Sequence, residues 1–233
     1  MTSRVVLGSA CAACALSSVA GAAIIRYDAS IGTVPTEQGF AYTGSIASPI
    51  DTNGPTLQHG PTTALDVSAW QKQFPTGTIN FANSTWTASM TVRLTGSDFG
   101  TYQGTRRAGY HIFVSDDAGR WIIAELGSNS IGLRNDAIGT GDPAVSVPMS
   151  ATFRTVMLEA GPSGAKLYLD GALQATLPLG TGQTVRNHFL WGDGSNTTHV
   201  DLAEVRDVTL VPAPGLAGLG IGALAVAARR RRR

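Results

Sequence analysis

The stretch Ala151–Leu179 carries the clearest secondary-structure signals of the chain. It reads ATFRTVMLEA over 151–160, GPSG over 161–164, AKLYLDG over 165–171 and ALQATLPL over 172–179. Two turn signals, Gly161–Gly164 and Asp170-Gly171, separate three apolar runs of strand length. Glycine reaches positive φ without a Cβ clash, and Asp-Gly between apolar runs is a strong hairpin signal. The stretch therefore predicts a three-stranded antiparallel meander.

Other segments repeat the pattern. From Trp86 to Leu94, apolar and polar residues alternate, which is typical of a strand with one buried face. Tyr110–Ser115 and Arg120–Leu126 flank a turn at Asp116–Gly119, and Thr198–Leu210 reads as the last strand. Glycine is abundant and helical patterns are scarce. The chain is therefore predicted to be all-β, a two-sheet antiparallel jelly-roll sandwich of about 11 to 13 strands.

The net charge of +1 hides an acidic body. Of the 17 basic residues, five are the last five residues of the chain and one is Arg4. Without these six, 11 basic residues remain against 16 acidic ones, a balance of −5. A body of this sign disfavours nucleic acid and anionic membrane surfaces. Both cysteines, Cys11 and Cys14, lie near the N-terminus, which excludes a disulfide framework, a thiolate metal site and a cysteine nucleophile from the body.

The first 22 residues have the pattern of a secretory signal peptide. Arg4 precedes the small-residue apolar run Val5–Val19, and Ala20-Gly21-Ala22 fits a small-x-small cleavage site. An N-terminal membrane anchor is the alternative. We expect residues 1–22 to be removed and residues 23–210 to form the sandwich.

The last 23 residues have a different pattern. Val211-Pro212-Ala213-Pro214 is followed by the apolar run Gly215–Ala228 and five arginines. As a single helix, the run from Val211 to Ala228 would extend about 27 Å, against a hydrocarbon core of about 30 Å. The arginines would stay on the cytoplasmic side, so the body would lie outside.

This tail, residues 211–233, resembles the PEP-CTERM sorting signal. The residues that carry the resemblance are Val211, Pro212, Pro214, Arg229, Arg230, Arg231, Arg232 and Arg233; Ala213 stands where the family usually has glutamate. The resemblance implies an exosortase partner, transient anchoring in the inner membrane, and export to the envelope or matrix of a Gram-negative bacterium. An ordinary tail anchor of the same orientation is the alternative.

Residues from about 85 to 210 resemble the concanavalin A-like superfamily, and most closely its laminin-G-like bacterial domains. The motifs that carry this resemblance are Phe153–Val156, Lys166–Gly171, Leu190–Asp193 and Asp201–Val208. It implies a two-sheet jelly roll. The superfamily includes lectins, polysaccharide hydrolases, lyases and adhesive modules, so the resemblance does not fix an activity.

The sequence contains no recognisable catalytic motif. Hydrolases of this fold place paired carboxylates at i, i+2 or i+4 on one strand face. No glutamate of the chain has an acidic partner at that spacing, and the four histidines are dispersed. A lyase would need a His or Tyr base beside Arg and Gln or Asn. A spatial cluster of Tyr110, His111 and Arg120 is left open.

The candidate ligand-binding residues are aromatic and basic. Exposed aromatic rings stack on sugars while polar groups bind hydroxyls, and the candidates are Tyr102, Arg106, Arg107, Trp121 and Trp191. For Trp121 and Trp191 the alternative is core packing. The family resemblance also implies a Ca²⁺ site at a sheet rim, with Asp193, Asn196 and Asp201 as ligands. The segments Asp51–Gly54 and Asp116-Asp117 are further calcium candidates, or simply turns.

These observations together predict a secreted, surface-sorted, non-catalytic β-sandwich that binds or structures extracellular polysaccharide. A polysaccharide hydrolase or lyase of the same fold is the first alternative. An envelope protein that is purely structural, with no small ligand, is the second.

Overall fold

A computed structural model describes residues 25–44, 50–52, 54–60, 67–96, 100–102, 105–107, 109–135, 144–193 and 200–213. For residues 100–102, 105–107, 200 and 201 it describes only the backbone. The predicted signal peptide, Pro214, the apolar tail and its arginines lie outside the described residues. The described part of the chain includes no helix that is long and apolar enough to cross a membrane.

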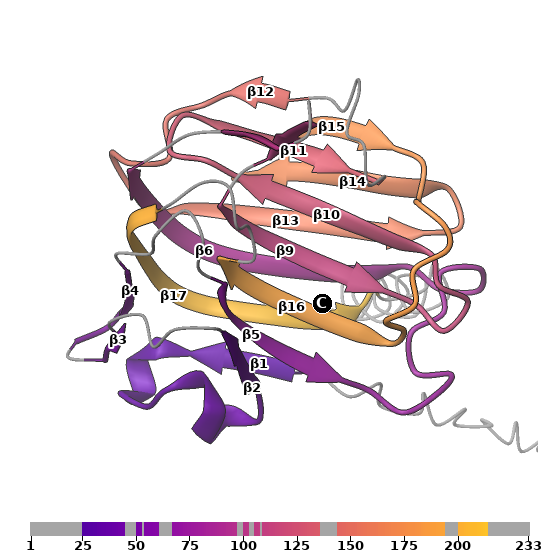
Figure 1. Cartoon of the computed structure of the whole chain (residues 1–233), viewed down its shortest axis with the longest axis horizontal. Helices are drawn as coiled ribbons and strands as arrows, with labels where there is room; N and C mark the ends of the chain where they lie inside the picture. Colours follow the sequence, from indigo (N-terminus) through magenta and orange to yellow (C-terminus); the bar gives the residue numbers. More distant parts are fainter. Residues whose placement is uncertain are drawn as a thin grey trace, which may run out of the picture.

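Two large antiparallel sheets make up the fold, with a separate two-stranded hairpin (Figure 1). The eight-stranded sheet has the order β15-β14-β13-β6-β17-β4-β3, and β1 also pairs with β17. Its strands are β1 (Ile25–Asp28), β3 (Ile50–Asp51), β4 (Leu57–His59), β6 (Trp86–Gly96), β13 (Arg154–Gly161), β14 (Gly164–Leu169), β15 (Ala172–Leu177) and β17 (Val200–Pro212). The prediction of an all-β, two-sheet antiparallel fold is confirmed.

The seven-stranded sheet has the order β12-β11-β10-β9-β16-β5-β2. Its strands are β2 (Ala41–Gly44), β5 (Ser68–Gln73), β9 (Tyr110–Ser115), β10 (Trp121–Leu126), β11 (Ser130–Arg134), β12 (Ala144–Ser146) and β16 (His188–Asp193). The hairpin consists of β7 (Gly100–Tyr102) and β8 (Thr105–Arg107), and two 3₁₀ turns, η1 (Ala29–Ile31) and η2 (Pro35–Gln38), follow β1. Short strands such as β3, β7 and β12 are additional to those read from the sequence, and the described residues form 17 strands against the 11 to 13 predicted.

The meander of β13, β14 and β15 forms as predicted. The φ angles of Asp170 and Gly171 are +48° and +81°, which suits a two-residue hairpin turn with positive φ at both central positions. Arg154 and the backbone N–H of Thr155 donate to the Asp170 carboxylate, over 2.5 and 2.9 Å. Asp170 therefore fixes the turn in addition to forming it.

The meander continues into the long central pair β6 and β17. Along β6 the residues alternate between buried and half-buried, with Trp86 through Leu94 inward at every second position as expected. The strand β17 continues past residue 210, because Val211 pairs with Thr87 and Pro212 with Trp86. The last strand therefore includes the first two residues of the predicted sorting motif.

The core lies between the two sheets and is rich in aromatic rings. Trp70 and Trp191 stack with their ring centroids 4.6 Å apart, and Tyr27 stacks on Trp191 at 5.6 Å. Aromatic pairs of this kind add to the stability gained from burial alone. The interior of the sandwich is therefore filled by its own side chains.

One polar bridge crosses this interior. His59 of β4 and Ser68 of β5, which belong to different sheets, are joined by a 2.6 Å hydrogen bond between Nε2 and Oγ. The Tyr42 hydroxyl lies 2.9 Å from the same Ser68 oxygen. Burial lowers the pKa of His59 from 6.5 to about 4, so the imidazole is neutral near pH 7. Its Nδ1 atom is buried and has no hydrogen-bond partner.

Candidate functional site

The candidate site is the outer face of the seven-stranded sheet, the face turned away from the core. Successive side chains of a strand point to opposite faces. In β10, Ile122, Ala124 and Leu126 belong to the core. Trp121, Ile123 and Glu125 therefore lie on the outer face, and the same alternation places residues of β9, β11 and β16 beside them.

Strand register brings residues from four strands together on this face. Glu125 stands opposite His111 of β9 and Gly132 of β11. Two positions earlier in β10, Ile123 stands opposite Phe113 of β9 and Arg134 of β11. Phe113 in turn stands opposite Leu190 of β16. These residues are separated by up to 79 positions in the sequence.

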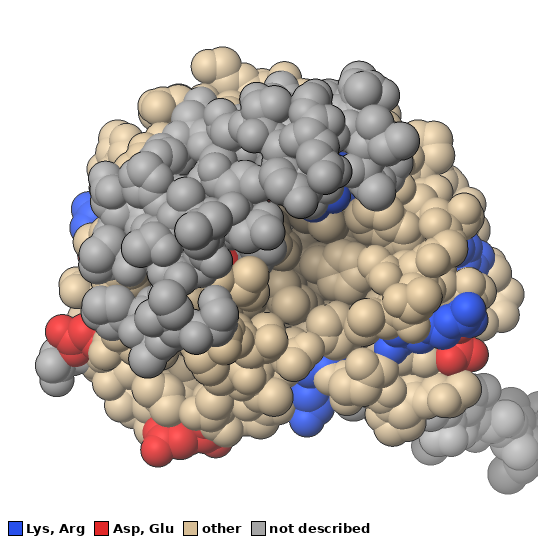
Figure 2. Space-filling view, viewed as in Figure 1, with Lys and Arg blue, Asp and Glu red and all other residues tan. Residues whose placement is uncertain are grey.

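Phe113, Trp121, Ile123 and Leu190 form an apolar floor. They make a hydrophobic cluster separate from the main core, and the first three are 7–8% exposed. The rings of Phe113 and Trp121 lie 6.2 Å apart. Figure 2 shows a hollow where β9, β10 and β16 lie in Figure 1, with uncharged residues at its bottom. A concave surface with an apolar lining is the usual setting for a ligand.

His188 supplies a polar atom beside this floor. Its ring lies 5.7 Å from the ring of Phe113, and its Nε2 lies 2.7 Å from the Gln71 amide oxygen. Burial lowers the pKa of His188 to about 4, so the ring is neutral near pH 7. Its Nδ1 is buried without a hydrogen-bond partner. Such an atom on an outer sheet face is an unused acceptor or donor next to a hollow.

A buried ion pair lies on the same face. The Arg134 guanidinium donates to the Glu125 carboxylate over 2.8 Å, and both side chains are buried. Pairing balances the two charges, and separating a buried pair is costly. No second carboxylate from the described residues of this sheet's strands joins Glu125 on the outer face.

The structure separates the predicted tryptophans. Trp121 lies on the outer face, where its indole N–H donates to the Thr181 carbonyl over 3.4 Å. Gly180 lies so close that a Cβ there would approach the Trp121 ring to 2.8 Å. Trp191 is fully buried in the core, because its position in β16 points inward. The prediction of Trp191 as a stacking platform is therefore corrected, and core packing holds.

The other predicted ligand residues lie in the hairpin. Tyr102 pairs with Thr105, Arg106 with Thr101 and Arg107 with Gly100. Only their backbone is described, so their part in ligand binding stays a prediction. The open cluster of Tyr110, His111 and Arg120 does not form. Tyr110 faces the core, and Arg120 binds Asp116.

The predicted calcium ligands are not brought together by the described residues. Asp193 is fully buried, at the end of β16, opposite Ser68 and Tyr110. Asp201 lies in β17 with only its backbone described, and Asn196 lies outside the described residues. No group of three or more His, Cys, Asp or Glu within the described part of the chain could hold a metal ion. The calcium site stays a prediction.

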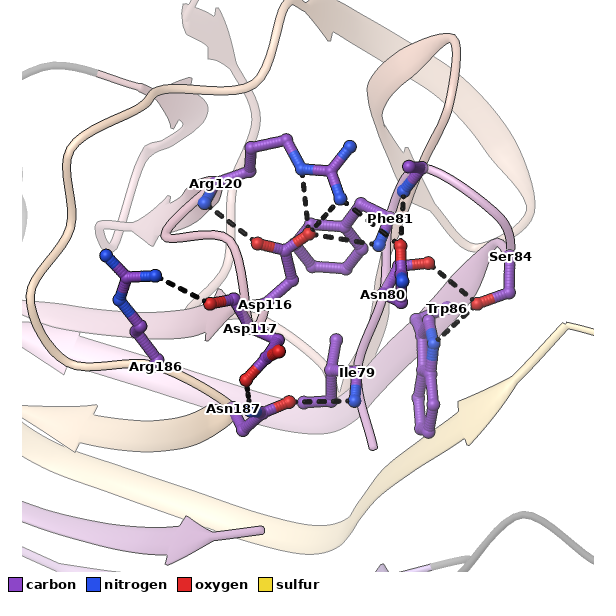
Figure 3. Close-up of polar contacts among 11 residues, drawn as sticks. Ile79, Asn80, Phe81, Ser84, Trp86, Asp116, Asp117, Arg120, Arg186 and Asn187 are labelled. Atoms are coloured by element: carbon purple, nitrogen blue, oxygen red, sulfur yellow. Dashed lines mark hydrogen bonds and ion pairs between the residues drawn. The ribbon is translucent and has the colours of Figure 1, made fainter. Parts of the chain in front are cut away.

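Asp116 and Asp117 have protein partners that a calcium ion would have to displace (Figure 3). The buried Asp116 carboxylate accepts from the backbone N–H groups of Phe81 and Arg120, over 3.1 and 2.9 Å, and from Arg120 Nε over 2.8 Å. Asp117 accepts from Asn187 Nδ2 over 2.6 Å. These contacts tie the β9–β10 turn to neighbouring segments, which supports the interpretation of this segment as a turn.

Sequence reasoning missed Phe113, His188, Gln71 and the Glu125–Arg134 pair. One signal was available. Tyr110–Ser115 and Trp121–Leu126 carry large apolar residues at odd and even positions alike. A strand with one wet face shows polar residues at alternate positions, so a second apolar set indicates that the outer face is also covered or used. The contact between His188 and Gln71 had no such signal, because 116 residues separate them.

No family model and no curated protein matches the chain. Solved structures, in contrast, do match the chain. The binding domain of Botulinum Neurotoxin DC in complex with SialylT is 14% identical at a TM-score of 0.47, covering 75% of this chain and 43% of that one. This chain thus spans less than half of the first structures it matches. A Crh5 transglycosylase in complex with NAG is 13% identical at a TM-score of 0.54, and the match covers 83% of this chain and 86% of the transglycosylase. A sialidase is 11% identical at a TM-score of 0.57, and the match covers 84% of this chain and 19% of the sialidase. The likenesses to the transglycosylase and the sialidase concern the fold.

Proposed function

We propose that this protein is a concanavalin A-like jelly roll that binds a polysaccharide chain in the hollow on its outer face. The observation that carries the proposal is the floor of Phe113, Trp121, Ile123 and Leu190, with a buried polar atom of His188 beside it. A sugar ring presents an apolar C–H face and a rim of hydroxyls. An aromatic floor with a few placed polar groups suits both.

The similar structures add support of a limited kind. One is a transglycosylase in complex with NAG, and another is a sialidase. Proteins that act on or bind sugars thus share the arrangement of strands. Because one fold hosts many functions, the contacts of this chain's own side chains must carry the proposal.

The proposed role is non-catalytic. Glycosidases of the common type need two carboxyl groups about 5–10 Å apart. On the described outer face Glu125 is held by Arg134, and both are buried. One observation favours the alternative enzyme, a lyase or hydrolase, because His111 stands directly opposite Glu125. Incubation with polysaccharides should release no reducing ends and no unsaturated sugars, and release of either would support the enzyme.

The binding test is a glycan array followed by titration calorimetry on hits. Phe113→Ala is expected to weaken binding at least tenfold, because it removes the centre of the floor. Tyr168→Ala is the matched control. Tyr168 is an aromatic of β14 that lies beside Met157 on the outer face of the other sheet. Absence of binding to any glycan would overturn the proposal and favour a purely structural envelope protein.

Export and sorting form a second part of the proposal, which rests on the two ends of the sequence. We expect removal of residues 1–22, inner-membrane anchoring through the tail, and processing by an exosortase. Intact mass spectrometry of the protein from its own cell envelope would reveal both cleavages. A full-length mass, or a body found in the cytoplasm, would contradict this part without touching the binding proposal.

A further inference from the structure

His188 lies at the start of a strand whose side chains alternate between the core and the outer face. It is the first residue of β16, and the following residues Phe189 and Trp191 alternate into the core. His188 and Leu190 therefore point to the outer face, where the His188 ring lies beside Phe113. On the neighbouring strands the residues opposite His188 are Ser115 of β9 and Gln73 of β5.

The hydrogen bond to Gln71 determines which nitrogen of His188 carries the proton. The Gln71 partner atom is its carbonyl oxygen, which is only an acceptor, so Nε2 must donate. In a neutral imidazole the other nitrogen then carries a bare lone pair. That atom, Nδ1, is an acceptor, and it is buried without a partner. A ligand at this point must therefore bring an O–H or N–H donor.

The surroundings keep the ring in this form. Ser115, Gln71, Gln73 and Phe113, the described neighbours on β5 and β9, have no charge near pH 7. Two cations are sequence neighbours of His188 and Gln71: Arg186 precedes His188 by two positions, and Lys72 follows Gln71. Arg186 donates to the Asp117 carbonyl, and Lys72 donates to the Gly39 carbonyl. The cation on the outer face, Arg134, is balanced by Glu125.

Building on the proposed function, we propose that His188 Nδ1 accepts a hydrogen bond from the C6 hydroxyl of a neutral hexose whose C–H face lies on Phe113. The site would thereby select neutral glycans over uronates. In a uronate the C6 hydroxyl is replaced by a carboxylate, which offers only acceptors, and two acceptors facing each other repel. A neutral sugar supplies the hydroxyl donor that the bare nitrogen needs, and the apolar floor takes its unsubstituted face.

The test compares neutral glucan oligosaccharides with glucuronan oligosaccharides of equal length, by calorimetry on the full protein at pH 7. Neutral chains should bind at least tenfold more tightly. His188→Phe keeps an aromatic ring and removes the acceptor, so affinity for the neutral chain should fall about tenfold. His188→Asn places an amide oxygen near the Nδ1 position and should retain most of the affinity.

A second variant changes the pH dependence of ligand preference, which a change in packing alone would not do. Gln71→Glu places a carboxylate on Nε2, which stabilises the imidazolium and raises the pKa of His188. Protonation turns Nδ1 into a donor. The preference for neutral over uronate chains should then shrink as the pH falls from 7 to 5 in this variant, and should stay constant in the unaltered protein.

The outcomes separate the two proposals. If the unaltered protein binds glycans and Phe113→Ala weakens binding, but His188→Phe does not, the inference is overturned and the proposed function stands. A preference for uronates in the unaltered protein, or an identical pH profile in Gln71→Glu, also overturns the inference. If no glycan binds, the proposed function fails, and the inference fails with it.

Discussion

His59 and His188 are alike in their immediate chemistry. Each is buried, each has Nε2 within hydrogen-bond distance of a side-chain oxygen, and each has a buried Nδ1 without a partner. Burial lowers both pKa values to about 4. They differ in what lies next to them. His59 packs between the sheets against Trp70 and Tyr110, with ring centroids 4.7 and 5.9 Å away. His188 lies beside the floor of a hollow.

This difference shows that burial by itself does not identify a functional residue. The interior position of His59 leaves no route for a ligand, so its bond to Ser68 serves to join the two sheets. His188 has the same polar atoms on the outer face of its sheet, beside the apolar floor that contains Phe113. Variants of the interior, of the two histidine sites and of the surface should therefore differ in how much stability they lose.

Truncation of an interior ring should cost the most. Trp191→Ala is expected to lower the free energy of unfolding by about 3–5 kcal/mol, because it leaves a cavity in the aromatic stack. Urea unfolding monitored by circular dichroism would measure it. Leu173→Ala is the control, since Leu173 is 54% exposed and its truncation should change little. A loss below about 1 kcal/mol for Trp191→Ala would contradict the assignment of this ring to the core.

Acid should weaken the interior bridge. His59 has a folded-state pKa of about 4 and an ordinary value of 6.5. Between these values the unfolded chain binds a proton that the folded protein excludes, so stability is full above pH 6.5 and falls as the pH drops toward 4. The expected loss is about 3 kcal/mol, at 1.36 kcal/mol per pKa unit. Unfolding curves from pH 7 to 4.5 would measure this slope, and His59→Gln should reduce it. If the free energy of unfolding falls equally steeply with pH in both proteins, the burial of His59 is not the cause.

Removing the partner of each histidine should have unequal effects. Ser68→Ala leaves a buried imidazole nitrogen unsatisfied inside the core, at a cost of about 1–3 kcal/mol. Gln71→Ala should cost less, about 1 kcal/mol, because water in the hollow can replace the lost oxygen. Thermal unfolding of the two variants side by side gives the comparison. Equal losses would mean that the two histidines lie in equally closed surroundings.

The smallest change is expected at the surface. Arg26→Ala breaks an ion pair with Asp28 whose arginine side chain is 57% exposed. Solvent screens such pairs, so the free energy of unfolding should change by at most about 0.5 kcal/mol. Unfolding at low and high salt would measure it. A larger loss, or one that does not change with salt, would contradict the view that solvent screens this pair.

Much of the fold was predictable because its signals are local. The meander followed from Gly161–Gly164 and Asp170-Gly171, and β6 followed from strict alternation. The short strands β3, β7 and β12 were missed, because two or three residues do not establish a period. Pairing with the adjacent strands β4, β8 and β11 forms them, and a run this short carries no pattern of its own that would reveal the pairing.

The candidate site was predicted less well. Trp121 and Trp191 were both ligand-binding candidates with core packing as the alternative, and the structure places Trp121 on the outer face and Trp191 in the core. Both occur in apolar runs of strand length. The inward or outward direction of each depends on register, and a shift of one residue reverses it.

The sequence alone determined the strand class, the antiparallel meander, the acidic body and the absence of cysteine chemistry from that body, because composition, turn residues and period-two alternation are local properties. Tertiary structure alone decided that Phe113, Trp121, Ile123 and Leu190 meet, and that Gln71 orients His188. Contacts across strands depend on which distant segments hydrogen-bond to one another and in which register. Those pairings are settled by the burial of the whole core, to which every strand contributes.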